Sequence, residues 1–342
     1  MQIPTSTKAW TRIAGGVPRG PLSNLVELVE RPLPRPLWGE VLIRMEAAPF
    51  NPSDEMYLRG EYGFHARPGD VPGFEGCGTV IAARGGPYAW WLRGKRGAFG
   101  GQDGNGTWSE YRVTGLYDCI PISKSLPITA AGTFIINPMT ALGLMAMVKR
   151  HRARAFSMNA AGSALGTYIL ALSQQAGISF IGLVRRPESA EKLIHAGAKY
   201  VLVTTESSFD DRYEELCKQL GATVLLDAVA GNETAKLMNA MPDESLAIVY
   251  GQLSQEKKSE ARVSFDPDGL VFRKQQVRGY WLTDELHGTI IPLHRARQIS
   301  KHYKKDLFRI PELAQCSLSS LIDAAQSNNG KTIFVNEPPT KE

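Results

Sequence analysis

A short run of small residues has the composition of a turn that holds a pyrophosphate group. The segment AFSMNAAGSALGTYILALSQQAG, residues 155–177, starts as an apolar strand and continues after the turn with apolar residues at helical spacing. Gly162, Ser163 and Gly166 are small enough for the backbone to approach a ligand, and free N–H groups at a helix start favour negative charge. The turn departs from G-x-G-x-x-G, because Ala161 and Ser163 stand where the first two glycines would be. Taken alone, it could also be a structural turn.

Two arginines indicate which dinucleotide such a turn would hold. Arg185 and Arg186 follow the apolar run FIGLV, about twenty residues beyond the turn. An acidic residue there would accept a hydrogen bond from the ribose 2′-hydroxyl of NAD, whereas arginine pairs with a 2′-phosphate. The pair therefore predicts NADPH. The alternative is that both are surface arginines at the start of a helix, which are common.

The elements that position these residues follow two patterns along the chain. The first third alternates short apolar runs with loops rich in Gly and Pro, which is typical of strands. From about residue 129, strands alternate with helices, which predicts a parallel sheet covered on both faces. We expect its six strands near 155–159, 179–184, 200–203, 223–227, 246–250 and 276–282. The segment GKTIFVN at 330–336 is expected to return a strand to the first domain.

The predicted fold class is therefore α/β, with a Rossmann doubly wound parallel sheet and a second domain rich in strands. A chain of 342 residues fits two domains, which we place at 128–283 for the nucleotide and at 1–127 with 284–342 for the other. Hydrophobic residues at 43% and charged residues at 21% are typical of globular proteins. These values exclude the disordered, fibrous and coiled-coil classes.

Charge, cysteines and hydropathy narrow the function classes further. A net charge of +5 is too small to indicate a nucleic-acid partner. No apolar run reaches the roughly 18 residues that span a bilayer, and the start of the chain lacks the apolar core of a secretion signal. We therefore expect a cytoplasmic protein without a membrane partner; residues 1–20 lack acids as a transit peptide does, but Gly15, Gly16 and Pro18 argue against one. Four widely spaced cysteines and an isolated His65 predict no disulfide framework and no metal site.

Several segments together resemble the medium-chain dehydrogenase/reductase superfamily, and within it the zinc-free members. They are NPSD at 51–54, PGFEGCGTV at 72–80, GTWSEYRV at 106–113 and the nucleotide-binding segments above. The resemblance implies that the strand-rich domain is a GroES-like catalytic domain and that the protein is a homodimer. Zinc-using relatives carry a Cys in the loop that reads PFNPSD here and a His at the position of Phe74. Because catalytic zinc needs three protein ligands, the resemblance implies no metal.

Two zinc-free branches of this superfamily remain, the 2-enoyl thioester reductases and the quinone reductases. The segments NPMTA at 137–141, NAAGSALG at 159–166 and RGYWL at 278–282 resemble those of the thioester reductases, whereas quinone reductases favour a turn of the type AAGGVG. The loop LRGEYG resembles both. The resemblance thus implies an NADPH-dependent enoyl-CoA or enoyl-ACP reductase, with a quinone or enone reductase as the alternative. A dinucleotide-binding sensor without turnover is the alternative from another class, because a fold does not specify chemistry.

The resemblance also implies site residues and partners. In the thioester reductases a tyrosine of the LRGEYG loop is catalytic, and the matching residue is Tyr62, which could donate a proton or orient the substrate after hydride transfer. Gln252 departs from the family, which usually has a second glycine there. A basic run at 294–305, expected on a helix, could attract coenzyme A phosphates or an acyl carrier protein. The implied nucleotide contacts are Asn137, Gly162, Ser163, Ala164, Leu165, Arg185, Arg186, Tyr250, Gly251, Gln252, Leu253, Tyr280, Trp281, Leu282 and Lys331.

Overall fold

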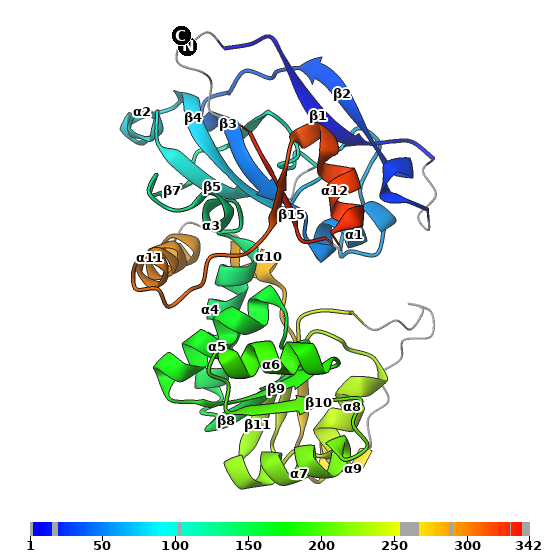
Figure 1. The fold of residues 1–342 in the computed structure, drawn as a ribbon. Coiled ribbons are helices and arrows are strands. Elements are labelled where there is room, and N and C mark those ends of the chain that lie inside the picture. The colour runs from blue at the N-terminus through cyan, green and yellow to red at the C-terminus, as the bar shows by residue number, and fades with distance from the viewer. Residues whose placement is uncertain are drawn as a thin grey trace. The chain divides into compact units, whose positions relative to one another are not determined.

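The computed structural model describes residues 3–15, 20–101, 104–253, 267–286, 290–328 and 330–336. The chain divides into two compact units (Figure 1). The first unit comprises Met1–Ile136, Gly288–Lys304 and Ile310–Glu342, and the second comprises Asn137–His287 and Lys305–Arg309. The domain limits given above stay a prediction.

A six-stranded parallel sheet forms the centre of the second unit. Its strands are β8 (Ala155–Met158), β9 (Ser179–Val184), β10 (Tyr200–Val203), β11 (Ala222–Asp227), β12 (Leu246–Val249) and β13 (Gln276–Gly279). They lie in the order β10-β9-β8-β11-β12-β13, so the chain starts at the centre, winds outward, and then crosses to the other half. This arrangement confirms the doubly wound sheet. The last strand is shorter than the expected 276–282, because the chain leaves the sheet after Gly279 and starts a helix at Leu282.

Helices cover this sheet, as its buried strands require. Figure 1 shows α5 and α6 on one face and α7 on the other. The buried residues Tyr213 and Cys217 of α7 pack with residues of β8, β9 and β11. The helices of the second unit are α4 (Ile136–Arg150, whose first residue belongs to the first unit), α5 (Ala164–Ala176), α6 (Pro187–His195), α7 (Phe209–Leu220), α8 (Asn232–Asn239), α9 (Pro267–Val271) and α10 (Leu282–Leu286).

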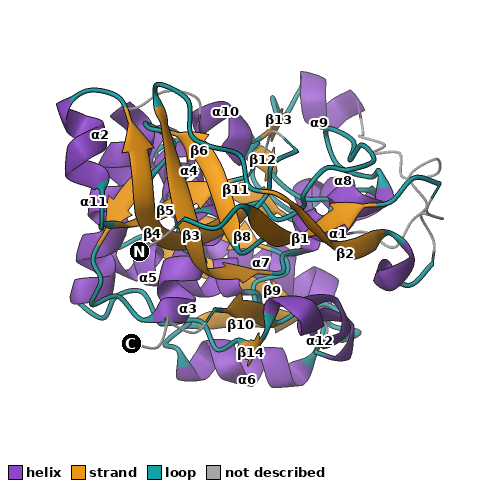
Figure 2. Ribbon diagram, turned by 90° about the horizontal axis from the view of Figure 1, so that it is seen from above, coloured by secondary structure: helices purple, strands orange, loops and turns teal. Residues whose placement is uncertain are grey.

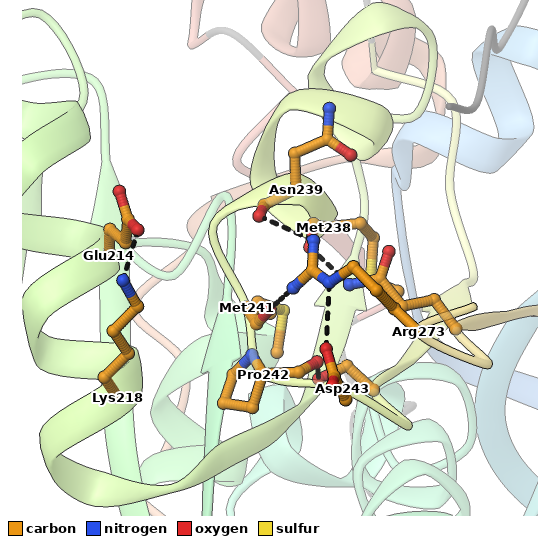
Figure 3. A network of polar contacts seen from close by, with 10 residues as sticks. Glu214, Lys218, Met238, Asn239, Met241, Pro242, Asp243 and Arg273 are labelled. Atoms are coloured by element: carbon orange, nitrogen blue, oxygen red, sulfur yellow. Dashed lines mark hydrogen bonds and ion pairs between the residues drawn. The ribbon is translucent and has the colours of Figure 1, made fainter. Parts of the chain in front are cut away.

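Arg273 joins the end of α8 to the segment that leads into β13 (Figure 3). Its guanidinium donates hydrogen bonds to the carbonyl oxygens of Asn239, at 3.1 Å, and Met241. Its Nε also donates to a carboxylate oxygen of Asp243 at 2.9 Å. The last carbonyl groups of a helix have no partner within the helix, so one side chain supplies donors at this end of α8.

The first unit is rich in strands and contains two sheets. A larger sheet has the order β14-β15-β3-β4-β5-β7, with β6 also paired to β3, and β1 and β2 form a separate antiparallel pair. β15 pairs antiparallel with β3, which confirms the strand expected at the tail. The strands are β1 (Ser6–Arg12), β2 (Val26–Pro32), β3 (Glu40–Pro49), β4 (Glu75–Arg84), β5 (Arg96–Gly100), β6 (Tyr111–Gly115), β7 (Ile120–Ile122), β14 (Ala314–Cys316) and β15 (Thr332–Val335).

The long strands β3 and β4 are neighbours in the larger sheet (Figure 2), and β3 contributes several side chains to the core of this unit. Trp108 is fully buried there, stacks on Phe50 with ring centroids 5.4 Å apart, and donates from Nε1 to the carbonyl oxygen of Pro49. All four cysteines are free. No helix in the described ranges is long and apolar enough to cross a membrane. The helices of this unit are α1 (Pro52–Arg59), α2 (Pro87–Leu92), α3 (Ile128–Gly132), α11 (Ile290–Lys304) and α12 (Leu321–Ser327). The helix expected at 294–305 is part of α11, which ends one residue earlier.

Candidate active site

The small-residue turn, residues 159–166, follows β8 in the second unit and includes the first residues of α5. Ser163 caps the helix, since its Oγ accepts a hydrogen bond from the N–H of Gly166 at 3.2 Å. A Cβ atom on Gly166 would lie 1.9 Å from the carbonyl oxygen of Ala161, so only glycine allows the helix to start this close to the turn. The backbone N–H groups at the start of α5 are therefore held against the turn, as a pyrophosphate site requires.

One alanine of the turn has a left-handed backbone conformation. Ala160 has a φ of 48°, a conformation that costs a non-glycine residue about 1 kcal/mol. Ala161, which stands where the family has a glycine, is instead fully buried and donates its N–H to the carbonyl oxygen of Leu183 in β9. The departure from the glycine pattern thus does not prevent the strand, turn and helix arrangement that the sequence predicts.

A buried polar network at the base of the turn was not predicted. Asn159 Nδ2 donates to Asp227 Oδ1 at 2.6 Å, and Asn159 Oδ1 accepts from the N–H of Ala228 at 2.7 Å. The hydroxyl of Thr234, in α8, donates to Asp227 Oδ2 at 2.5 Å. Both Asn159 and Asp227 are buried, so the network fixes the ends of β8 and β11 relative to each other. Asp227 lies far from the turn in sequence, and no local pattern marks it.

The loop after β12 lies on the end of β11. Tyr250 donates its N–H to the carbonyl oxygen of Asp227, and Leu253 donates to that of Ala228 at 3.0 Å. A Cβ atom on Gly251 would lie 2.7 Å from the same carbonyl oxygen of Ala228. Burial raises the pKa of the Tyr250 hydroxyl far above its usual range, and the charge of Asp227 raises it further. The neutral form of the Tyr250 hydroxyl, which can donate and accept hydrogen bonds, is therefore favoured.

Tyr280 is positioned by a glycine of α4. A Cβ atom on Gly143 would lie 2.1 Å from the Tyr280 hydroxyl, which donates to Glu285 Oε2 at 2.5 Å. Trp281 and Leu282 follow directly and lead into α10. Asn137 is the second residue of α4. The structure therefore brings Tyr280 beside the helix that carries Asn137.

Arg185 and Arg186 lie at the carboxyl end of β9, next to the strand that leads into the turn. Both side chains are exposed. Within the described ranges, neither guanidinium forms an ion pair or a hydrogen bond; Arg185 contributes only its carbonyl oxygen, to the hydroxyl of Thr205. Two cations without internal partners fit an anionic group of a ligand.

The nucleotide contacts expected in the second unit follow the carboxyl ends of β8, β9, β12 and β13 or lie on α4. Because carboxyl ends of parallel strands meet at one edge of a doubly wound sheet, these residues share the edge at which such sheets bind ligands. The small-residue turn and the arginine pair thus fit a phosphorylated dinucleotide. Tyr62 and Lys331 belong to the first unit, and their contacts with the nucleotide or substrate stay predictions.

In the first unit, Tyr62 is held in an aromatic cluster. Its ring lies 4.9 Å from that of Phe74 and 5.1 Å from that of Phe64, centroid to centroid, and meets Phe64 edge-on at 86°. Tyr57 contacts the same two phenylalanines. A shallow surface recess is lined in part by Tyr57, Phe64 and Phe74. Aromatic packing on two sides orients the half-buried Tyr62 ring.

Two buried carboxyl groups support this cluster from α1 and β4. Asp54 accepts hydrogen bonds from the backbone N–H groups of Asn51, at 2.7 Å, and Phe74, at 2.8 Å. Glu75 accepts from Asn51 Nδ2 at 3.1 Å. Its other oxygen accepts from the N–H groups of Ile135 and Ile136 at the start of α4, at 3.0 and 2.9 Å. Glu75 therefore ties three segments of the first unit together.

Burial is the largest influence on the pKa of both carboxyl groups. It raises the pKa of Asp54 to about 8 and that of Glu75 to about 7, although the N–H donors favour the charged forms. These residues lie inside the NPSD and PGFEG segments, but their shared contact with Asn51 was not predicted. Their geometry indicates positioning of the loop rather than contact with substrate.

In the described part of the first unit, the segments compared with the zinc ligands of relatives hold side chains that do not fit zinc. Phe74 is buried among aromatic rings, and the side chain of Asn51 is committed to Glu75. Across the part of the chain that the structure describes, no three His, Cys, Asp or Glu side chains are grouped to hold a metal ion.

Comparison with known proteins finds one family model that matches within the first unit and a second that matches mainly within the second unit. Residues 38–124 match the alcohol dehydrogenase GroES-like domain, and residues 164–295 match the zinc-binding dehydrogenase family. The mitochondrial enoyl-[acyl-carrier-protein] reductase of Dictyostelium discoideum is 27% identical over 319 residues, which cover 87% of this chain and 86% of that protein.

Solved structures show the same fold. A Mesorhizobium loti protein, provisionally assigned as an NADPH:quinone reductase, is 29% identical with a TM-score of 0.89, covering 98% of this chain and 100% of its own. The Candida tropicalis mitochondrial 2-enoyl thioester reductase Etr1p/Etr2p heterodimer is 20% identical with a TM-score of 0.82, covering 97% and 100%. A complex of Etr1p with NADP and crotonyl-CoA matches equally well. The GroES-like unit and the parallel nucleotide-type sheet therefore identify the chain as an oxidoreductase of the medium-chain dehydrogenase/reductase superfamily.

Proposed function

We propose that this oxidoreductase uses NADPH to reduce the carbon–carbon double bond of a 2-enoyl thioester, without zinc. The assignment of NADPH as cofactor rests on Arg185 and Arg186 beside the small-residue turn. Both side chains are exposed, and neither guanidinium has an ion pair or hydrogen bond among the described residues. The substrate class is supported by the enoyl-[acyl-carrier-protein] reductases among the relatives and by the resemblance of the Tyr62 loop. NADPH, when bound, supplies the hydride for the β-carbon of the alkene.

The protein's own residues would bind the cofactor, orient the substrate and donate a proton to it. The N–H groups at the start of α5 would hold the pyrophosphate, and the arginine pair the 2′-phosphate. Negative charge develops on the thioester oxygen as the alkene is reduced, so a donor aimed at that oxygen lowers the barrier. We assign this donor, or the proton donor to the α-carbon, to the hydroxyl of Tyr62.

The cofactor assignment is tested by Arg185→Ala with Arg186→Ala. Loss of both charges should raise the KM for NADPH by about 10- to 100-fold and leave the KM for NADH unchanged, because only NADPH carries the 2′-phosphate. Arg150→Ala with Arg154→Ala removes two exposed arginines from other segments and is the matched control. An unchanged preference for NADPH in the first variant would exclude this role.

The catalytic assignment is tested by Tyr62→Phe with crotonyl-CoA as substrate. Turnover should fall by about 10²- to 10⁴-fold, the usual contribution of a proton donor, while the Kd for NADPH stays the same. Tyr117→Phe, at an exposed position outside the cluster, should keep full turnover. Full turnover in Tyr62→Phe would remove it from the mechanism.

A second candidate is an NADPH:quinone or enone reductase, which is favoured by the similarity to the Mesorhizobium loti protein. The two candidates share the nucleotide site and differ in substrate. Steady-state oxidation of NADPH with crotonyl-CoA and with 9,10-phenanthrenequinone distinguishes them. A higher kcat/KM for the quinone would favour the second candidate.

We also propose a homodimer that forms through β13. All four residues of this edge strand are exposed, and among the described residues no strand pairs with its outer edge. Gln276 and Tyr280 donate their N–H groups toward β12, so those of Val277 and Gly279 point outward by alternation. Val277→Pro should therefore remove an outward donor and convert the dimer to a monomer in analytical ultracentrifugation. A wild-type monomer would contradict the proposal.

The proposal also includes the carrier of the acyl group and the location of the protein in the cell. Arg297, Lys301 and Lys304 are exposed on α11 and could attract coenzyme A phosphates or an acidic acyl carrier protein. The KM for either carrier should then rise with salt, and a KM independent of salt would contradict this role. The proposed location is the cytoplasm, which imaging of a fluorescent fusion would test.

A further inference from the structure

Large hydrophobic side chains are exposed at one corner of the first unit. Trp38 and Trp90 are 77% and 76% exposed, far more than rings of this size usually are. We term the following residues the aromatic corner: Leu37, Trp38, Tyr88, Trp90, Trp91 and Tyr117.

Backbone contacts bring the three segments of the aromatic corner together. Gly39 donates its N–H to the carbonyl oxygen of Arg84 at 2.8 Å and accepts from Leu116 at 2.8 Å. The turn at 37–39 therefore lies between the end of β4 and the segment that carries Tyr117. A Cβ atom on Gly85 would lie 3.1 Å from the Cβ of Ala89 and 3.6 Å from Leu116, so α2 packs against the same point.

The rings of the aromatic corner are partly preassembled. Tyr88 stacks on Trp91 at 5.7 Å and on Tyr117 at 5.8 Å, with interplanar angles of 18° and 13°. Lys95 Nζ lies 5.1 Å from the centre of the Trp91 ring. Because the stack already exists, a partner would order few side chains on binding.

The charge around the aromatic corner is positive and is not neutralised within the chain. Within the described ranges, the four exposed cations of these segments form no ion pair; they are Arg35, Arg84, Arg93 and Lys95. The same segments contain two carboxylates, Glu40 and Asp118, and Glu40 accepts a hydrogen bond from the N–H of Leu37. An anionic partner would complement this surface.

We propose that the aromatic corner binds the surface of a membrane that contains anionic lipids. Tryptophan and tyrosine favour the level of the lipid headgroups, and neighbouring lysine and arginine add attraction to anionic lipids. A three-residue turn and the six residues of α2 carry most of these rings, which suits shallow insertion rather than a span. The proposal replaces the sequence-based expectation of a protein without a membrane partner.

Cosedimentation with vesicles tests the proposal. The protein should bind vesicles of phosphatidylcholine with one third phosphatidylglycerol, bind vesicles of phosphatidylcholine alone much less, and dissociate at high salt. Its tryptophan emission should shift to the blue on binding. Arg93→Gln with Lys95→Gln should lower the partition coefficient by about 30-fold, and Trp38→Ala with Trp90→Ala should lower it and abolish the shift.

Controls come from the second unit. Phe272→Ala removes a ring that is 75% exposed, and Arg150→Gln with Arg154→Gln removes two exposed cations; both variants should bind as the wild type does. Circular dichroism checks folding, and NADPH turnover is measured separately because the proposal does not depend on it. Absence of vesicle binding, equal binding to neutral vesicles, or unchanged binding of the variants would overturn the proposal. So would loss of self-association in Trp38→Ala with Trp90→Ala, because the corner would then join two copies of the chain.

Discussion

Asn159 and Asp227 meet at the base of the small-residue turn, with Asn159 Nδ2 donating to Asp227 Oδ1 at 2.6 Å. The contact links the ends of β8 and β11, the central strands of the doubly wound sheet. Its partners are all buried or part-buried, so no water replaces a lost hydrogen bond without rearrangement.

The first prediction concerns this contact. Asn159→Ala should lower the free energy of unfolding by about 3 kcal/mol, because the N–H of Ala228 and one side of Asp227 lose their buried partners. The KM for NADPH should rise as the turn loses its support. Urea unfolding and steady-state kinetics measure the two effects. Asn239→Ala, which removes an exposed amide, is the control and should change neither.

A second prediction concerns Gly166. Gly166→Ala would place Cβ 1.9 Å from the carbonyl oxygen of Ala161, so the turn must move away from the helix start. The affinity for NADPH, measured by calorimetry, should fall by at least about tenfold, because the N–H groups no longer converge on the pyrophosphate. Thr167→Ala changes a half-buried neighbour without a clash of this kind and should bind normally. Normal affinity in Gly166→Ala would mean that the pyrophosphate lies elsewhere.

The third prediction is a dependence of stability on pH. The pKa of Glu75 is about 7 in the folded protein against 4.5 ordinarily, so the folded state binds the extra proton between these values. Stability from this group is complete below about pH 4.5 and is lost as pH rises through about 7, a change on the order of 3 kcal/mol. Asp54, with a pKa of about 8, adds a loss of the same sign.

Unfolding free energies at several pH values test this prediction. Glu75→Gln cannot ionise and should reduce the fall in stability between pH 5 and pH 8, without removing the part due to Asp54. Glu214→Gln is the control, because the pKa of that exposed carboxylate is lowered by its hydrogen bond with Lys218. The slope should not change in the control. Equal slopes in wild type and Glu75→Gln would show that Glu75 is ionised throughout.

A fourth prediction concerns Arg273, which donates to two carbonyl oxygens near the end of α8 (Figure 3). Arg273→Ala should lower the free energy of unfolding by about 2 kcal/mol, because these acceptors lose a charged donor in a part-buried place. Lys218→Ala breaks an exposed ion pair with Glu214 on α7 and should have almost no effect. If thermal unfolding shifts equally in both variants, the position of Arg273 has no special role.

Much of the second unit could be predicted, because the patterns that indicate its strands and its turn lie within short stretches of sequence. Apolar runs separated by helical segments located all six strands, and the small residues at 159–166 located the turn. The end of β13 was wrong by three residues, since Tyr280, Trp281 and Leu282 have strand-like composition but leave the sheet. Local composition does not show where a ladder of hydrogen bonds stops.

The polar networks could not be predicted, because their members are distant in sequence. Asp227 is the last residue of an apolar strand, and only folding brings it to Asn159. Glu75 stands in a recognised motif, yet its contacts with Ile135 and Ile136 depend on how β4 packs against the start of α4. The exposed rings of α2 were likewise hidden in a short apolar run that resembles core.

The position of β15 within the first unit has a consequence for the order of folding. β15 lies between β14 and β3 in the sheet, although the ribosome makes β3 long before β15. During synthesis the second unit, which ends at Arg309, can therefore assemble while the Ala47–Pro49 end of β3 has no partner on the side that β15 later occupies. A nascent chain stalled in this interval would expose the backbone edge of these three residues, a short site for pairing with another chain.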